Sequence, residues 1–411
     1  MSGMLDLSWV RSQFPALSGD WVYFDNAGGS QTLQSVADRV SDYLLSTNVQ
    51  LGASYAVSQE AGRRVAEATR AMAGVINARD EHEVVIGAST TQLLANLALA
   101  MRPQLREGDE VIVTNCDHEA NIGPWARLAD QGVTVKTWKV DPGTLELRLE
   151  DLAPLMSGRT RLVTFTHASN ILGTINPVAD IARFVHEHGA RVCVDAVSYA
   201  PHRAVDVQAW DVDYYVFSAY KVYGPHVAVL YGKRELLEEL GTINHYFVPD
   251  HDVPRKLQPG SVNYELSYGL LGVSEYLEAL AVRHADTPAD SLHGRVAQAY
   301  AVMAEQEQAL ATTLLDYLRD KPGVRIYGQD RADGAGRVPT VSFTAAGLDP
   351  ATVAAHVDGA YIGIRYGDFY ARRLIEALGL GERNGVVRVS MVHYNTLEEL
   401  DALIACLDEL L

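Results

Sequence analysis

The chain has 411 residues, of which 48% are hydrophobic and 21% are charged, a balance typical of a globular enzyme with an ample core. Its formal net charge of −18 at pH 7 argues against nucleic acid or an anionic membrane as a partner. The cysteines Cys116, Cys193 and Cys406 are scattered, so we expect neither a disulfide framework nor a metal site. The first residues lack an apolar signal core and no run of about 18 apolar residues occurs, which predicts a cytoplasmic protein.

The N-terminal part is predicted to contain a short helix, a strand and two longer helices. Ser8 is a suitable cap for the short helix, which ends before Pro15. Residues 21–24 read as a strand that leads into the small polar loop 25–30. Such a loop permits a ligand to approach the backbone closely, although a plain turn is an alternative. Helical spacing of apolar residues then covers 33–44 and 65–75.

From residue 83 onward, short apolar runs alternate with helical patterns. The expected strands cover residues 83–86, 110–113, 133–137, 161–165, 191–194, 213–217 and 227–231, and the expected helices cover 90–101, 120–130 and 178–187. Alternation over about 150 residues predicts a mostly parallel sheet covered by helices.

The C-terminal part has a different pattern. Residues 267–318 are helical with a possible break at 287–290, and the remainder reads as a smaller α+β unit. Its expected strands are 324–326, 338–343 and 386–390, and its expected helices lie near 350–357 and 369–378 and from 396 onward. We therefore expect an N-terminal segment (1–20) packed on a small domain (286–411), and a large domain (21–285).

Two neighbouring strands of the expected sheet end in chemically active side chains. Asp195 follows the strand 191–194, and the strand 213–217 ends in Ser218-Ala-Tyr-Lys221. If the strands are parallel, both groups lie at the edge where open α/β sheets bind ligands. A lysine that forms a Schiff base and an acid that keeps a pyridine nitrogen protonated suit pyridoxal phosphate (PLP). A salt bridge at the sheet edge is the alternative.

Other strand ends carry weaker signals of the same kind. Residues 87–91 (GASTT) could hold a phosphate at a helix N-terminus or simply cap it. His118 could lie flat on an aromatic ring or be a buried structural histidine, and Asn170 could donate to a phenolate oxygen or cap a turn. No dinucleotide fingerprint or P-loop motif occurs.

Together these motifs resemble the class V aminotransferase group of fold-type I PLP enzymes, specifically its cysteine desulfurase-like branch, from about Tyr23 to the C-terminus. The resemblance implies an α/β fold with a large domain and a smaller α+β C-terminal domain. It implies that His118 in DHEANIGPW stacks on the PLP ring, that Asn170 in THASNILGTINPV contacts the phenolate and that Asp195 pairs with the pyridine nitrogen. Lys221 in FSAYKVYGP would carry the cofactor, so the implied catalytic residues are Lys221, His118 and Asp195.

The resemblance implies further contacts. The other cofactor contacts are Ser89, Thr90, Thr91, Ser198, Ser218 and Tyr220, with Gly260 and Ser261 in QPGSVN reaching across the interface of a homodimer with shared active sites. The substrate, an amino acid as a small molecule, would have its α-carboxylate bound by Arg388 in GVVRVSMVHYNT. Its other contacts would come from Asn26, Ala27, Gly28, Asn121 and Tyr370.

One departure from the family separates this chain from desulfurases. Tyr370 in the segment Arg365–Tyr370 stands where they carry a nucleophilic cysteine, and a phenol with a pKa near 10 cannot accept sulfur as a persulfide.

We therefore expect β-elimination through a Cα carbanion, as in C–S lyases, and not persulfide-forming desulfuration. Aldol-type or decarboxylative C–C bond chemistry in a biosynthetic pathway, transamination and epimerisation are alternatives. A protein that only binds a ligand would not need the retained Lys221, Asp195, His118 and Arg388.

Overall fold

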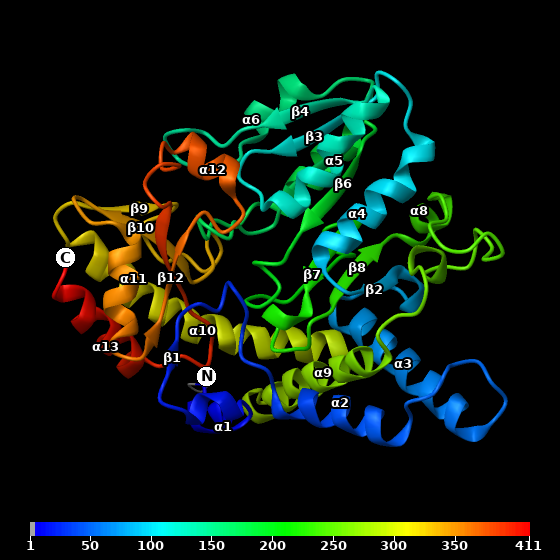
Figure 1. The fold of residues 1–411 in the computed structure, drawn as a ribbon, viewed down its shortest axis with the longest axis horizontal. Coiled ribbons are helices and arrows are strands. Elements are labelled where there is room, and N and C mark those ends of the chain that lie inside the picture. Colours follow the sequence, from blue (N-terminus) through cyan, green and yellow to red (C-terminus); the bar gives the residue numbers. More distant parts are fainter. Residues whose placement is uncertain (1–4) are drawn as a thin grey trace.

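The computed structural model describes residues 5–411 and contains a large sheet, a small sheet and a two-stranded ribbon (Figure 1). The seven strands of the large sheet have the order β2-β8-β7-β6-β5-β3-β4. Strand β8 runs antiparallel to its neighbours β2 and β7, and the other neighbouring pairs are parallel, which confirms the predicted α/β class. The strands are β2 Val84–Gly87, β3 Glu110–Thr114, β4 Thr134–Trp138, β5 Thr160–Thr166, β6 Arg191–Asp195, β7 Tyr214–Ser218 and β8 Ala228–Gly232.

The central strands of the large sheet carry apolar side chains on both faces. Both faces are therefore buried against helices. Val192 and Val194 of β6 belong to one apolar cluster, while Cys193 between them belongs to the cluster on the other face. This is the period of two that a strand requires. Helices α7, α9 and α10 supply the first cluster and α4 supplies the second. The helices are α1 Leu7–Ser12, α2 Gln34–Ser46, α3 Ala56–Val75, α4 Thr90–Met101, α5 Gly123–Ala126, α6 Leu149–Leu152, α7 Val178–Glu187, α8 Arg234–Glu239, α9 Tyr264–His284, α10 Leu292–Arg319, α11 Pro350–Asp358, α12 Arg372–Ala377 and α13 Leu397–Asp408.

Two local predictions were wrong. The expected helix over 120–130 is a chain of single turns around α5, because Pro124 has no N–H to continue a helix from the preceding turn. Helix α1 begins before Ser8, and its cap is Asp6, whose Oδ1 accepts from the Trp9 N–H at 3.0 Å.

The small sheet is antiparallel and has the order β12-β13-β10-β9. Its strands are β9 Val324–Tyr327, β10 Thr340–Ala345, β12 Arg365–Gly367 and β13 Val386–Ser390. Helices α11 and α13 pack on it together with the C-terminal half of α10. The N-terminal half of α10 instead packs with α9 in the core of the large sheet, so this helix joins the two units. The domain boundary at residue 285 stays a prediction.

The N-terminal segment connects both units. Strand β1 (Val22–Tyr23) pairs in parallel with β11 (Ile362–Gly363), and Arg11 contacts the carbonyl of Tyr394 and the carboxylate of Glu399. Asp6 pairs with Arg283 at the end of α9. The segment therefore contacts α9 as well as the small domain.

Residues 5–411 contain no helix long and apolar enough to cross a bilayer, and no cluster of three or more potential metal ligands.

Candidate active site

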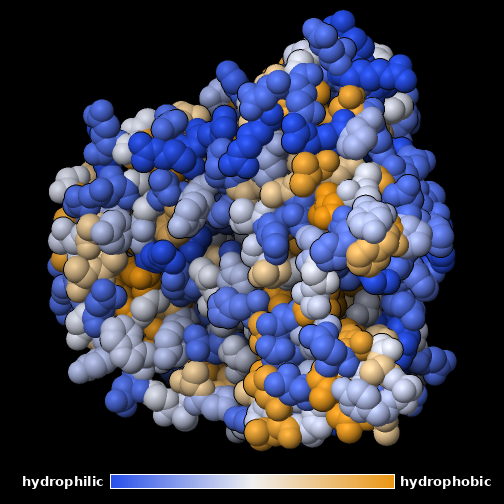
Figure 2. All heavy atoms as spheres, turned by 45° about the vertical axis from the view of Figure 1, so that its right-hand side comes forward, coloured by the Kyte–Doolittle hydropathy of each residue, from blue (hydrophilic) through white to orange (hydrophobic). Residues whose placement is uncertain are grey.

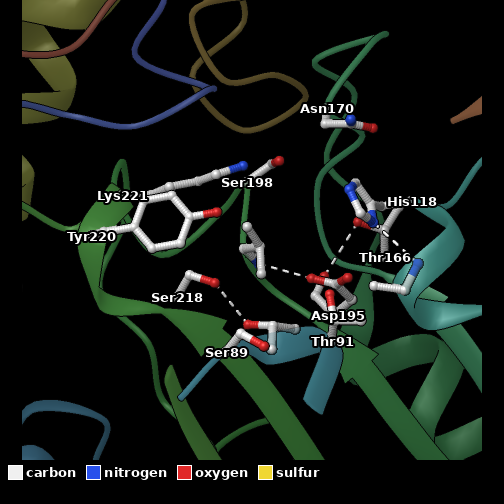
Figure 3. A pocket seen from close by; sticks show the side chains of 13 residues that line it. Ser89, Thr91, His118, Thr166, Asn170, Asp195, Ser198, Ser218, Tyr220 and Lys221 are labelled. Atoms are coloured by element: carbon white, nitrogen blue, oxygen red, sulfur yellow. Dashed lines mark hydrogen bonds between the residues drawn. The ribbon is translucent and has the colours of Figure 1, made fainter. Parts of the chain in front are cut away.

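A cavity with about 520 Å³ of empty space, part of it open to solvent, lies at the C-terminal edge of the large sheet (Figure 3). Parallel strands release their following loops at one edge, so residues far apart in the sequence meet there. Every predicted cofactor contact except Gly260 and Ser261 lines this cavity. The lining residues are Ser89, Thr90, Thr91, His118, Ala120, Thr166, Asn170, Asp195, Val197, Ser198, Ser218, Tyr220 and Lys221.

Lys221 and Asp195 come from adjacent parallel strands, as predicted. Lys221 ends the turn after β7, where burial, aided by the charge of Arg388, lowers its pKa to about 8. Asp195 ends β6, where burial raises its pKa to about 6, although its Oδ1 accepts from the Val197 N–H at 2.9 Å. The cavity therefore offers an amine that is readily neutral and a carboxylate that would gain from a cationic partner.

His118 faces the same cavity from the loop after β3 (Figure 3). Its Nδ1 accepts from the Ala120 N–H at 3.0 Å, which assigns the ring proton to Nε2. Burial, followed by the charge of Lys221, lowers its pKa to about 4. At neutral pH the ring is thus uncharged, as a ring that stacks on a heterocycle requires.

The cavity floor is built to hold an anion. Helix α4 begins at Thr90, and its first N–H groups have no acceptor within the helix. These groups and the helix dipole favour a phosphate. The Ser89 hydroxyl caps the helix at the Gln92 N–H, while the hydroxyls of Thr90 and Ser218 are 2.8 Å apart and present oxygens from both α4 and β7.

Asn121 belongs to a buried polar network and does not line the cavity. Its Nδ2 donates to the Asp117 carboxylate, and its Oδ1 accepts from the Thr164 hydroxyl at 2.7 Å, so its contact with a substrate stays a prediction. Asp117 also accepts from the Thr166 N–H at 3.0 Å, and burial raises its pKa to about 7. Sequence reasoning missed Asp117 and Thr166, although both follow predicted strand ends.

The loop after β1 is fastened to the small domain. The Asn26 amide donates to the carbonyls of Tyr23 and Ser390, and the Tyr394 hydroxyl donates to its Oδ1. The Asn26 side chain is thus engaged by protein partners, and its predicted contact with the substrate stays a prediction. Ala27 and Gly28 do not line the cavity either. A Cβ at Gly28 would lie 2.8 Å from the Asp25 carboxylate, so a side chain at this position would displace that carboxylate.

Arg388 lies in β13 with 2% of its side chain exposed. Its Nη2 donates to Asp25 Oδ1 at 3.0 Å and its Nη1 donates to the Asn170 carbonyl at 3.2 Å, next to the cavity wall. The Phe369 ring covers the guanidinium at 3.7 Å. Burial lowers the pKa of Arg388 to about 10 against the opposing effect of Asp25, so the group remains a cation at neutral pH.

Tyr370 lies beside the cavity on the loop between β12 and α12. Its carbonyl accepts from the Glu119 N–H at 2.8 Å, and its exposed ring is centred 5.2 Å from the His118 ring. The Asn170 amide, predicted to reach a phenolate, donates here to the Phe369 carbonyl at 2.9 Å. None of the three cysteines lies on this loop: two are buried in the large sheet region and Cys406 is in α13.

Gly260 and Ser261 lie outside the cavity. Both are exposed, and Ser261 lines a separate groove with Gly87, Ala88 and Gln92, next to the start of α4. Within one chain, therefore, Ser261 does not complete the anion site.

The comparisons with known proteins agree with this geometry. The family model for aminotransferase class-V matches residues 22–403. The aminotransferase-like protein FGM3 of Gibberella zeae is 44% identical over the full length of both chains. The cysteine desulfurase-like protein ustD of Aspergillus flavus is 35% identical and covers all of this chain and 92% of its own. Among solved structures, the cysteine desulfurase CsdA of Escherichia coli has a TM-score of 0.83 at 29% identity, with 99% of this chain and 98% of that chain covered.

The residues in the cavity fit the cofactor of this family. PLP needs a lysine of lowered pKa, a carboxylate for its pyridine nitrogen and an anion site for its phosphate, and the cavity contains all three. The fold is that of fold-type I PLP enzymes and the cofactor is pyridoxal 5′-phosphate. This chain belongs to the class-V aminotransferase family, in its cysteine desulfurase-like branch.

Proposed function

We propose that this enzyme removes the Cα proton of an amino acid with a free α-carboxylate and expels a leaving group from Cβ. The observation that carries the proposal is the pairing of a buried lysine of lowered pKa with Tyr370, instead of a thiol, beside His118. When bound, PLP withdraws electrons from the Cα atom of the amino acid.

The side chains of the cavity divide the work. Lys221 accepts the proton as the Cα–H bond breaks, and its pKa of about 8 is near the operating range of a general base. Asp195 holds the proton of the pyridine nitrogen, and His118 keeps the ring plane in place with an uncharged imidazole. Arg388 binds the α-carboxylate with its planar guanidinium. The Cβ substituent leaves with the bonding electron pair and takes up the proton that Lys221 removed from Cα. Water then converts the released enamine into a 2-keto acid and ammonia.

Persulfide formation has no support in the thiols of this chain. It requires a thiolate that can approach the sulfur of the substrate. Burial raises the pKa of Cys116 and of Cys193 above the ordinary range, so both remain protonated thiols. Cys406 belongs to the last helix, on the small domain. We therefore propose that sulfur leaves the substrate directly and is not transferred to the protein.

C–C bond formation or cleavage at Cβ is a second candidate function. Its support is Tyr370, which is 69% exposed beside the His118 ring and offers a phenol instead of a thiol. The same residues would serve this chemistry, as they would transamination or epimerisation. The nature of the product separates these reactions.

The test is incubation of the holoenzyme with a panel of amino acids, including S-substituted cysteines, followed by mass spectrometry of small molecules and protein. We expect a 2-keto acid and a free thiol in equal amounts, with no mass added to any cysteine. Persulfide on Cys116, Cys193 or Cys406 at the rate of turnover would contradict the proposal. A product that incorporates an added aldehyde would select the second candidate.

We also propose a homodimer with shared active sites. Its support is the exposed position of Ser261 beside the start of α4, where a second chain could bring an equivalent serine to the anion site.

A further inference from the structure

Arg388 belongs to a group of three charges that the proposed reaction does not yet explain. The Asp25 carboxylate lies between two guanidinium groups: Oδ1 is 3.0 Å from Nη2 of Arg388, and Oδ2 is 3.6 Å from Nη1 of Arg365. Asp25 follows β1, whereas the arginines belong to strands β13 and β12 of the small sheet. Three segments distant in sequence therefore meet at this carboxylate.

Arg388 needs a counter-ion before any substrate arrives. Only 2% of its side chain is exposed, and a buried charge without a partner is strongly destabilising. Its Nε has no hydrogen-bond partner within residues 5–411, its Nη1 contacts a neutral carbonyl and one face is covered by Phe369. Asp25 thus provides the only carboxylate that the described part of the chain places in contact with this guanidinium.

Asp25 differs from Arg388 in being able to change partner. Its side chain is 34% exposed, and that of Arg365 is 56% exposed, so both can move without leaving a charge in an apolar interior. The backbone of Asp25 is held by its bridge to Ser390 and by the hydrogen bonds of Asn26, so the carboxylate can rotate while the loop stays in place.

We propose that Asp25 is a positioning residue that occupies Arg388 in the absence of substrate, competes with the substrate α-carboxylate for it, and is taken over by Arg365 when substrate binds. This inference rests on the proposed role of Arg388 in binding that carboxylate. It adds a selection step, because only an anion that outcompetes Asp25 gains access to the guanidinium.

Binding of propionate to the holoenzyme, measured by calorimetry, tests the competition without turnover. Asp25→Asn removes the competing charge and should tighten propionate binding by about tenfold. In Arg365→Gln, Asp25 has only Arg388 as an ion-pair partner and competes with propionate more strongly. This variant should therefore bind propionate about two- to threefold more weakly, the scale of an exposed ion pair. The matched control, Asp20→Asn, changes the same net charge at an exposed position of the same segment and should leave the affinity unchanged.

Two results would overturn the inference: weaker or equal binding to Asp25→Asn, which would make Asp25 only an orienting residue, or the same tightening in Asp20→Asn. Melting temperatures of the variants verify folding, and Arg365→Gln, at an exposed site, provides an independent test if Asp25→Asn is unstable. Arg388→Lys separates this inference from the proposed function. We expect it to abolish propionate binding; if it does not, Arg388 is not the carboxylate site, whatever Asp25 does.

Discussion

Burial sets the protonation state of the residues in the cavity more than any single contact does. Removal from water is the first cause of the lowered pKa of Lys221 and His118 and of the raised pKa of Asp195. In each case the change favours the uncharged form of the group. The cofactor then supplies the charges that these groups lack.

The lowered pKa of Lys221 makes a pH prediction. The neutral amine is the form that attacks the aldehyde carbon of PLP, and its fraction rises with pH until the pKa is passed. Reloading of the apoenzyme should therefore accelerate up to about pH 8 and then level off, because the pKa is about 8 and not the ordinary 10.5. Stopped-flow absorbance at several pH values measures this rate. A rate that continues to climb through pH 10 would show that Lys221 is not desolvated in solution.

The sequence predicted which side chains after the strand ends line the cavity, but it did not predict the partners of Asn26 and Asn121. Lys221 and Asp195 follow buried strands, whose pattern is local, and the sheet edge then brings them together. Asn121 donates to Asp117, only four residues earlier, and this pair was overlooked. Asn26 donates to the carbonyl of Ser390, which is 364 positions away, so no local pattern could reveal its partner. The ion pair of Asp25 with Arg388 spans 363 positions and was invisible for the same reason.

At the scale of elements, the segment from β12 to α12 determines where Tyr370 lies. The loop accepts two hydrogen bonds, from the Glu119 N–H to the Tyr370 carbonyl and from the Asn170 amide to the Phe369 carbonyl. Helix α12 is held by a bidentate ion pair between Arg373 and Glu119, with both distances 3.0 Å. Phe369 and Tyr370 both have positive φ, 50° and 59°, a backbone conformation that needs such support. The segment from β12 to α12 is therefore attached to the loop that carries His118.

We predict that Arg373→Gln frees this segment. The substrate KM should rise several-fold while PLP stays bound, and the loss of stability should remain below about 1 kcal/mol because the ion pair is exposed. Steady-state kinetics and thermal unfolding measure the two effects. The control is Arg183→Gln, an exposed arginine whose partner Asp180 lies in the same helix, α7. Equal kinetic changes in both variants would show that the Glu119 link does not position Tyr370.

The continuous helix expected at 120–130 is absent because Pro124 cannot continue a helix from the preceding turn, an effect that the prediction left out. Helices α4 and α7 begin and end where predicted, since each has an uninterrupted apolar face. The strands β11 and β12 were not predicted. They are two and three residues long and exist through pairing with β1 and β13, which a sequence pattern does not encode.

The whole molecule is held together by contacts across its two units. The Tyr276 hydroxyl contacts Nε2 of His393, and Nδ1 of His393 is 3.1 Å from the Tyr223 hydroxyl, two residues beyond Lys221. Since His393 follows β13, this buried chain couples the turn that carries the lysine to the strand that carries Arg388. The alternation of strands and helices was enough to predict the large sheet, but not these contacts.

The surface provides a reason to expect a second chain. Figure 2 shows apolar residues gathered at the lower part of one face, the level at which α2 and α3 lie in Figure 1. The exposed apolar side chains of these helices and the segment between them are Leu44, Leu45, Tyr55 and Val57. Such a patch favours an interface.

We predict that Ser261→Ala weakens PLP retention several-fold in the dimer, because a hydroxyl donor to the phosphate of the other subunit is lost. Dialysis against buffer, followed by absorbance of the retained cofactor, measures the effect. Ser8→Ala, at an exposed position of α1, is the control and should retain PLP like the wild type. Full activity in a protein that sediments as a monomer would refute the shared site.

The most direct test of the central claim is the location of the covalently held cofactor. The holoenzyme is reduced with borohydride, digested, and mapped by mass spectrometry. The account predicts that the pyridoxyl mass appears on the peptide containing Lys221 and not on the other buried lysine, Lys256, whose Nζ donates to the carbonyls of Glu238 and Asp250. Label on Lys256 or any other lysine, with Lys221 unmodified, would contradict the assignment of the active site.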